Sequence, residues 1–469
     1  MNRPRTVGDL FPTRRELLKF GGLGLVGASL DAIWPLRVQA ASIGTKPRPR
    51  GTARNVVFFE ISGAISHLDT FDFKENPATP KDFQVRKTST GIYLPANMFP
   101  RMDKVMDRIA LVRSFVSHEE VHLRGQYYLQ AGRPLNVAFA REIPSVGSVV
   151  ASELESRRRE SDTFPTYVSF NLETNQVGAL STGFLPPRFS VFDLNAQQAL
   201  SGMSLDQKAM ELIEERWRVL QSLRESRGKM SSYGRDVAAF EDFSGTAKRL
   251  LTDSRWPAAF QVSDDDRKRY GNTATGIACT LARNVLTQDA GTRYIHICQH
   301  GWDHHRNIWD RSLEDNHYKL IGDFDPAAAS LIEDLATTPS KATPGKSLLD
   351  ETLVVLMSEF GRTPGPLNHM AGRDHHKYVF PALFAGAGVK GGLVIGASDA
   401  DGARCVQPGW NQKEQPRIEN VVATIYSALG IDWSKEVRNL PSGRTYVYVD
   451  PLGANGTIPT DELSQIYGS

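Results

Sequence analysis

The chain has 469 residues, 40% of them hydrophobic, which is enough to bury a large core without covalent staples. Its 55 Lys and Arg residues nearly balance 53 Asp and Glu residues, so the formal net charge is only +2. The three cysteines, Cys279, Cys298 and Cys405, lie far apart. This composition excludes a small disulfide-framework protein.

The N-terminal segment has the pattern of a twin-arginine export signal. Arg14 and Arg15 precede a glycine-diluted, modestly apolar stretch at 20–30, and Val38-Gln39-Ala40 fits a small-x-small cleavage site. The apolar run is well short of the about 20 residues that span a bilayer. We therefore expect residues 1–40 to be removed after passage through the twin-arginine (Tat) export machinery. The mature protein is expected in the periplasm or the medium, with no transmembrane segment.

Removal of this signal changes the charge of the protein. Residues 1–40 contain six basic and three acidic side chains, so the formal charge of +2 becomes −1 for the remainder. No long run of Lys or Arg follows. We therefore expect no nucleic-acid partner.

After a Pro/Arg-rich linker at 41–54, short apolar β-type runs alternate with helical patterns. The expected strands are 55–61, 108–114, 166–170, 293–297 and 353–357, and the expected helices are 204–226, 234–251, 327–336 and 418–429, with a helix-like stretch at 378–385. Continuous rather than alternating apolar strands favour a parallel sheet that is covered on both faces. The sequence therefore predicts an α/β fold, a doubly wound and mostly parallel sheet over 55–469, with a helical insertion near 200–270.

Polar residues follow four of these strands at the point where each strand ends. They occupy 60–72, 117–122, 300–305 and position 359. Ligands in open α/β sheets bind outside the carboxyl ends of the strands, so we expect these segments to meet at one edge.

Eight of the eleven histidines fall between His296 and His376, in runs that also contain carboxylates. In Asp303-His304-His305 the first and third residues could turn to one side of an extended loop, so Asp303 and His305 are predicted metal ligands. His304 would then point away. The alternative is a polar loop whose histidines only form hydrogen bonds.

The segment after the fifth strand adds further candidates. His375 is a predicted ligand, and Asp374 is either a ligand or a carboxylate that orients an imidazole. Glu359 at the strand end is a third possible acidic ligand. Arg362 would either recognise an anionic group such as phosphate or sulfate, or form a structural ion pair with Glu359.

The segments after the first two strands are more ambiguous. His67 and Asp69 are two positions apart and could contribute to the same metal site from a shared face. Ser66 and Thr70 are nucleophile candidates, although such residues are more often turn or cap residues. His122 could face the site as a catalytic group.

Several motifs together resemble one family of exported bacterial proteins, the domain of unknown function 1501. They are Leu68-Asp69-Thr70-Phe71-Asp72, Arg269-Tyr270-Gly271, Gly301-Trp302-Asp303-His304-His305, Met357-Ser358-Glu359-Phe360-Gly361-Arg362-Thr363-Pro364, Gly372-Arg373-Asp374-His375 and Gly386-Ala387-Gly388-Val389-Lys390-Gly391-Gly392. The family resembles the alkaline phosphatase and sulfatase superfamily. That resemblance implies an alkaline phosphatase-like fold, with Asp and His metal ligands at strand ends. Glu359-Phe360 stands where the superfamily has Asp-His, so the number of metal ions is open.

Two functions are consistent with these features. The first is an exported metal-dependent hydrolase of phosphate or sulfate esters, in which Zn²⁺ or Mn²⁺ fits the mixed imidazole and carboxylate ligands better than Ca²⁺. Its nucleophile remains open between Ser66, Thr70, Ser117 and water. The second is a catalytically silent, metal-containing binding protein of the cell envelope.

Overall fold

The computed structural model describes residues 47–172, 181–202, 207–227, 245–410, 414–451 and 460–468. The expected export signal, its cleavage site and most of the expected helix at 234–251 lie outside the described residues. None of the described helices combines the length and the apolar character needed to span a lipid bilayer.

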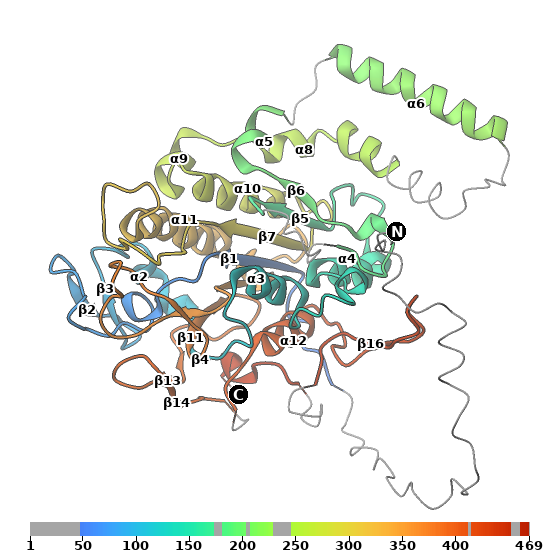
Figure 1. Ribbon diagram of the computed structural model, residues 1–469. Coiled ribbons are helices and arrows are strands. Elements are labelled where there is room, and N and C mark those ends of the chain that lie inside the picture. Colours follow the sequence, from blue (N-terminus) through green and yellow to red (C-terminus); the bar gives the residue numbers. More distant parts are fainter. Residues whose placement is uncertain are drawn as a thin grey trace, which may run out of the picture. The chain divides into compact units, whose positions relative to one another are not determined.

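An eight-stranded sheet forms the centre of the fold (Figure 1). Its strands, in spatial order, are β12 (Val394–Ile395), β4 (Ile109–Phe115), β11 (Phe380–Ala385), β8 (Thr352–Met357), β1 (Asn55–Ile61), β7 (Tyr294–Gln299), β5 (Tyr167–Phe170) and β6 (Phe192–Leu194). All neighbouring pairs are parallel except those of β11, which runs antiparallel to both β4 and β8.

Alternate side chains of β1 enter two separate hydrophobic cores. Val57 and Phe59 pack in the core that includes α10 (Ala274–Gln288) and α11 (His317–Thr337), whereas Val56 and Phe58 pack in the other. Helices α3 (His122–Ala131), α4 (Val146–Leu154) and α12 (Ile418–Ala428) contribute to that second core, on the opposite face of the sheet (Figure 1). Each fully buried apolar side chain stabilises the fold by about 1.5–3 kcal/mol. The doubly wound, mostly parallel architecture is confirmed.

Most expected strands agree with the structure to within two residues, but one expected element is wrong. The stretch 378–385, expected to be helix-like, contains strand β11 instead. A continuous apolar run of this length fits a buried strand as well as a helix, and the sheet interior between β4 and β8 decides in favour of the strand. Helix α10 was not anticipated, and α11 begins ten residues before the expected 327.

The described part of 200–270 is helical, as the periodicity predicted. It contains the end of α5 (Ala196–Gly202), then α6 (Gln207–Arg227), α8 (Arg255–Ala259) and α9 (Asp264–Tyr270). Apart from short 3₁₀ turns, the other elements of the described residues are α2 (Met102–Val105), β2 (Val85–Lys87), β3 (Tyr93–Pro95), β9 (Gly361–Arg362), β10 (His375–His376), β13 (Ala397–Ser398), β14 (Cys405–Gln407), β15 (Glu436–Val437) and β16 (Tyr446–Val447). Cys279, Cys298 and Cys405 all lie in the described residues, and none of them forms a disulfide bond.

The strand directions determine which loops meet. Strands β1, β4, β7 and β8 run the same way, so their carboxyl ends lie at one edge of the sheet. Because β11 runs the opposite way, the segment just before it, which includes β10, arrives at that same edge. Five segments that are distant in sequence therefore converge there.

Candidate metal centre

Four side chains gather at this edge of the sheet: His122, Asp303, His305 and His375. One ligand atom from each lies within 4.8 Å of the others. The Asp303 Oδ1 atom is 2.9 Å from His122 Nε2, 3.1 Å from His305 Nε2 and 3.6 Å from His375 Nε2. The three imidazoles thus present the same ring nitrogen to one carboxylate.

The four ligand candidates come from three different segments of the fold. His122 is the first residue of α3, which follows β4, and Asp303 and His305 lie in the loop after β7. His375 is carried by β10, whose antiparallel partner β9 pairs it with Arg362 just after β8. The alternation of strands and crossover connections therefore brings side chains that are up to about 250 positions apart in sequence to one edge of the sheet.

The second ring nitrogen of each histidine contacts an acceptor oxygen. His122 Nδ1 lies 2.7 Å from Glu359 Oε1, and His305 Nδ1 lies 2.7 Å from Asp374 Oδ1. His375 Nδ1 contacts the backbone carbonyl of Glu120. Where a cation takes the place of the Nε2 protons, Nδ1–H donates in each case and the neutral rings turn their Nε2 lone pairs toward that cation, which is how metal-binding histidines are usually oriented.

The donor set fits a divalent cation. His305 Nε2 and His375 Nε2 are only 2.8 Å apart, and two lone pairs at that distance repel unless a proton or a cation lies between them. Three imidazoles and one carboxylate suit four-coordinate Zn²⁺ and also Mn²⁺. The side chains of Asp303 and His305 are 47% and 39% exposed, so solvent reaches one side of the group. Four protein ligands fill a tetrahedral Zn²⁺ site, so water or a substrate would take a fifth position on this open side.

Arg362 is buried and holds Asp303 in place. Its guanidinium Nη2 lies 2.6 Å from Asp303 Oδ1, while Nε donates to the carbonyl of Ala64 and Nη1 to that of Arg373. The side chain is only 1% exposed. Its donors are used by the protein, so Arg362 positions Asp303 and does not present a free fork to an anion. The alternative ion pair with Glu359 is replaced by one with Asp303.

Glu359 lies behind His122 rather than beside the other ligand candidates. Its carboxylate is 0% exposed and accepts hydrogen bonds from His122 Nδ1 and from the backbone N–H of Gly63 at 3.0 Å. A Cβ atom on Gly125 of α3 would come within 2.9 Å of Glu359 Cβ. Glycine at 125 therefore allows the close approach of α3 that places His122 against Glu359.

The carboxylates around His122 stabilise its charged form. Burial opposes protonation, but hydrogen bonds to Asp303 and Glu359 outweigh it and raise the pKa of His122 to about 9. Burial likewise opposes ionisation of Asp303, yet hydrogen bonds from His122, His375 and Arg362 hold the pKa of Asp303 far below its usual range. Asp303 is thus a permanent negative charge at the centre of the group.

The residues predicted after β1 lie elsewhere. His67 is fully buried, with Nε2 2.7 Å from the Gly402 carbonyl, and Asp69 forms a buried 2.7 Å ion pair with Arg373. Ser66 donates its hydroxyl to Asp69, and Thr70 donates its hydroxyl to the Ser66 carbonyl. The segment His67–Asp69 forms a 3₁₀ turn rather than an extended strand, so the expected common face is lost.

The structure thus brings together three of the predicted metal ligands, Asp303, His305 and His375. His122, expected as a catalytic group, joins them at ligand distance. Glu359 and Asp374 lie one step further out, as acceptors for imidazole N–H groups. His304 points away, with Nε2 against the carbonyl of Asp315. The Glu120 carbonyl was missed, because a backbone acceptor leaves no signal in the sequence.

Comparison with protein families identifies the chain over residues 53–451, which match the family described as protein of unknown function (DUF1501). The chain belongs to the DUF1501 family. This match covers β1 and every residue of the candidate metal centre. A comparison with curated proteins finds no match.

Several solved structures have a chain path with some similarity to that of this protein. One is a protein in the alkaline phosphatase superfamily from Vibrio parahaemolyticus, with 12% identity, TM-score 0.35, and 82% of this chain and 70% of that chain covered. Another is the phosphonate monoester hydrolase of Agrobacterium radiobacter, with 11% identity, TM-score 0.34, and 82% and 74% covered. A third is a 2-O GAG sulfatase, with 11% identity, TM-score 0.30, and 89% and 75% covered. Any function must therefore be inferred from the geometry of the site.

Proposed function

We propose that this DUF1501 protein is an exported metal-dependent hydrolase of phosphate or sulfate esters. The observation that supports this proposal most is the convergence of three Nε2 atoms on Asp303, each histidine having its Nδ1 held by an acceptor. Such an arrangement is typical of imidazoles that bind a metal ion. Zn²⁺ or Mn²⁺ is the preferred occupant.

In this proposal the side chains of His122, Asp303, His305 and His375 hold the cation. A bound cation would polarise the ester oxygen and lower the pKa of water. Arg362 keeps Asp303 in position, and Glu359 and Asp374 orient their imidazoles through the hydrogen bonds described above. The half-exposed side of the group, at Asp303 and His305, admits an anionic ester.

The hydroxyl groups that follow β1 form hydrogen bonds within the protein, which affects their use as nucleophiles. Ser66 and Thr70 donate to protein oxygens and are buried, so neither offers a free hydroxyl to a substrate. Ser117 is buried as well, and its Oγ accepts a hydrogen bond from the backbone N–H of Glu119, so we favour water as the attacking group. Burial of Thr70 and Ser66 within a polar turn gives them a structural role instead.

Metal analysis of purified protein tests the site. We expect close to one equivalent of metal in the wild type, and loss of at least about tenfold in metal affinity for Asp303→Ala and for His375→Ala. His369→Ala is the matched control, because His369 is an exposed histidine on a neighbouring loop outside the group. Unchanged metal content in both site variants would refute the proposal.

Activity is tested with aryl phosphate and aryl sulfate esters and added Zn²⁺ or Mn²⁺. Turnover that disappears in His375→Ala but persists in His369→Ala supports a hydrolase. The engaged hydroxyls of Ser66 and Thr70 also suit the second function, a silent metal-containing binding protein of the envelope. Stoichiometric metal without turnover of either ester class would favour that protein.

Export is a separate part of the proposal and is tested by cell fractionation. Replacement of both Arg14 and Arg15 by Lys should retain the protein in the cytoplasm, whereas the wild type should reach the periplasm or the medium. Equal export of the wild type and the double variant would refute export by the twin-arginine route.

A further inference from the structure

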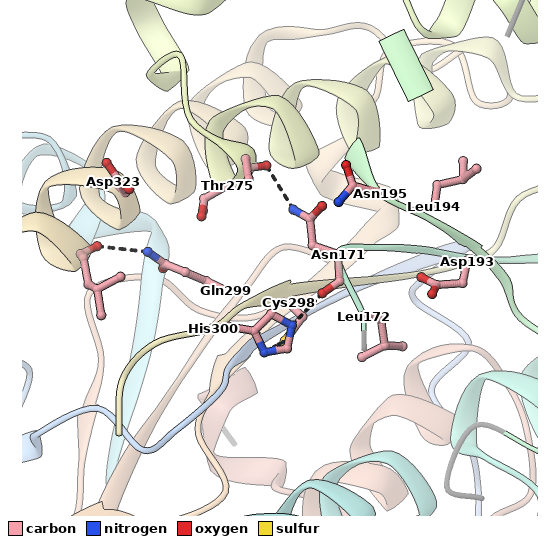
Figure 2. A pocket seen from close by; sticks show the side chains of 12 residues that line it. Asn171, Leu172, Asp193, Leu194, Asn195, Thr275, Cys298, Gln299, His300 and Asp323 are labelled. Carbon is pink, nitrogen blue, oxygen red and sulfur yellow. Dashed lines mark hydrogen bonds between the residues drawn. The ribbon is translucent and has the colours of Figure 1, made fainter. Parts of the chain in front are cut away.

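A cavity of about 390 Å³ opens at the carboxyl ends of β5, β6 and β7, on the far side of β7 from β1 (Figure 2). Its polar lining includes Asn171, Asp193, Asn195, Gln299, His300 and Asp323. None of these residues belongs to the candidate metal centre. His300 and the metal-centre residue Asp303 are three positions apart, so at most about 11 Å of chain separates them.

Gln299, which lines this cavity, has an acceptor atom without a partner in the described part of the chain. The residue is only 3% exposed, and its Nε2 donates to the Leu320 carbonyl at 3.0 Å. Its Oε1 is buried and has no hydrogen-bond partner among the described residues. A buried acceptor without a donor is unfavourable, so an occupant of the cavity that donates a hydrogen bond would be stabilised there.

The two carboxylates select against an anionic occupant. Burial raises the pKa of Asp193 and the pKa of Asp323, so both carboxyl groups lie in partly desolvated surroundings that would not stabilise a further negative charge. Asp193 accepts a hydrogen bond from the Ser169 hydroxyl at 2.6 Å and keeps further acceptor capacity. A neutral occupant rich in hydroxyl groups suits such a lining better than a phosphate or a sulfate.

The wall around Asn171 is held in one arrangement. Asn171 adopts a left-handed conformation with φ 59°, its Nδ2 donates to the Ala274 carbonyl at 3.1 Å, and its own carbonyl lies 2.7 Å from His300 Nε2 (Figure 2). With Nε2–H donating, His300 Nδ1 is the acceptor, 3.6 Å from Cys298 Sγ. A wall fixed by such contacts recognises an occupant with little loss of entropy.

We propose that this cavity binds one sugar unit through its hydroxyl groups. Amides and carboxylates match hydroxyls that both donate and accept, and Leu172, Leu194 and Leu320 supply apolar contact for a sugar ring. The volume lies in the range of small-molecule sites. Sugar binding itself does not depend on the metal centre. Its role as the recognition site for the alcohol portion of an ester rests on the proposed hydrolase function.

Ligand-observed NMR on the full-length mature protein tests the proposal. The probes are methyl β-glucoside, methyl β-galactoside and methyl N-acetyl-β-glucosaminide at about 10 mM, which reveals dissociation constants in the millimolar range. We expect at least one glycoside to bind. Gln299→Met and the half-exposed Asp323→Asn should each weaken that binding by about tenfold or more.

Glu333→Gln is the matched control, since it removes an acidic charge from the same helix, α11, outside the cavity. It should bind the glycoside like the wild type. The proposal is overturned if no glycoside binds, if ethanolamine binds in place of the sugars, or if both cavity variants bind as tightly as the control. His375→Ala should lose metal but keep glycoside binding, so failure of the hydrolase and failure of the sugar site give different results.

Discussion

Replacing Glu359 by Gln tests whether the acceptors behind the imidazoles tune the metal centre. The side chain is fully buried and accepts from His122 Nδ1 at 2.7 Å and from Gly63 N–H at 3.0 Å. Glutamine keeps the shape and a carbonyl acceptor for both donors but removes the negative charge that strengthens the His122 bond. Loss of such a partner weakens metal affinity by about 10–100-fold, which corresponds to about 1.4–2.8 kcal/mol.

The assay is competition for Zn²⁺ against a chromophoric chelator, with circular dichroism to verify the fold. Glu351→Gln is the matched control, because Glu351 is also a buried carboxylate but accepts from Ser340 and Thr343 at the opposite end of β8. We expect wild-type Zn²⁺ affinity in the control. A Glu359→Gln protein that is folded and binds Zn²⁺ as tightly as the wild type would refute the reasoning.

Three further predictions concern the packing of Gly125, the titration of His67 and the removal of metal. Gly125→Ala should destabilise the fold by about 1–3 kcal/mol and weaken metal binding, because its Cβ would lie 2.9 Å from Glu359 Cβ. Gly322→Ala is the control, since its Cβ would meet nothing within 4 Å, and it should stabilise α11 by about 0.5–1 kcal/mol. Urea denaturation measures both free energies of unfolding. Burial lowers the pKa of His67 from 6.5 to about 3, so its stabilising contribution is complete above pH 6.5 and is lost as the pH falls. The free energy of unfolding of the wild type should therefore fall by about 2 kcal/mol between pH 7 and pH 5, and this fall should be smaller in His67→Gln. The same pH dependence in both proteins would contradict the prediction. Chelation of the metal should lower the free energy of unfolding by about 2.7 kcal/mol, compared with protein in the presence of free metal at 100 times Kd. An unchanged melting temperature would argue against a metal site that exists only in the folded protein.

The sheet was largely predictable because its strands are continuous apolar runs. Strand β1 coincides with the expected 55–61, and β8 differs from 353–357 by one residue. The run in β11 carries the same kind of side chains, yet its length and composition also fit a buried helix segment. Only its two neighbours in the sheet, β4 and β8, distinguish the alternatives, and such long-range pairing is not encoded locally.

The candidate site likewise contains residues that the local sequence predicts and contacts that depend on long-range folding. Asp303, His305 and His375 were predictable because carboxylate and imidazole groups cluster after strands. The buried ion pair of Asp69 with Arg373, 304 positions away, was not, and it removes Asp69 from the site. Arg362 was noticed, but its partner Asp303 depends on how the β7 and β8 loops meet.

The reversed strand has a consequence for how the protein matures. Strand β11 separates β4 from β8, so the sheet stays in two pieces until residues near position 380 insert between them. His375 precedes that strand by only a few residues, so we expect it to reach its partners when β11 inserts. Pairing across such sequence separations is slow. Cation uptake with native affinity should accordingly be among the last events of refolding, and it would report that the two pieces have joined.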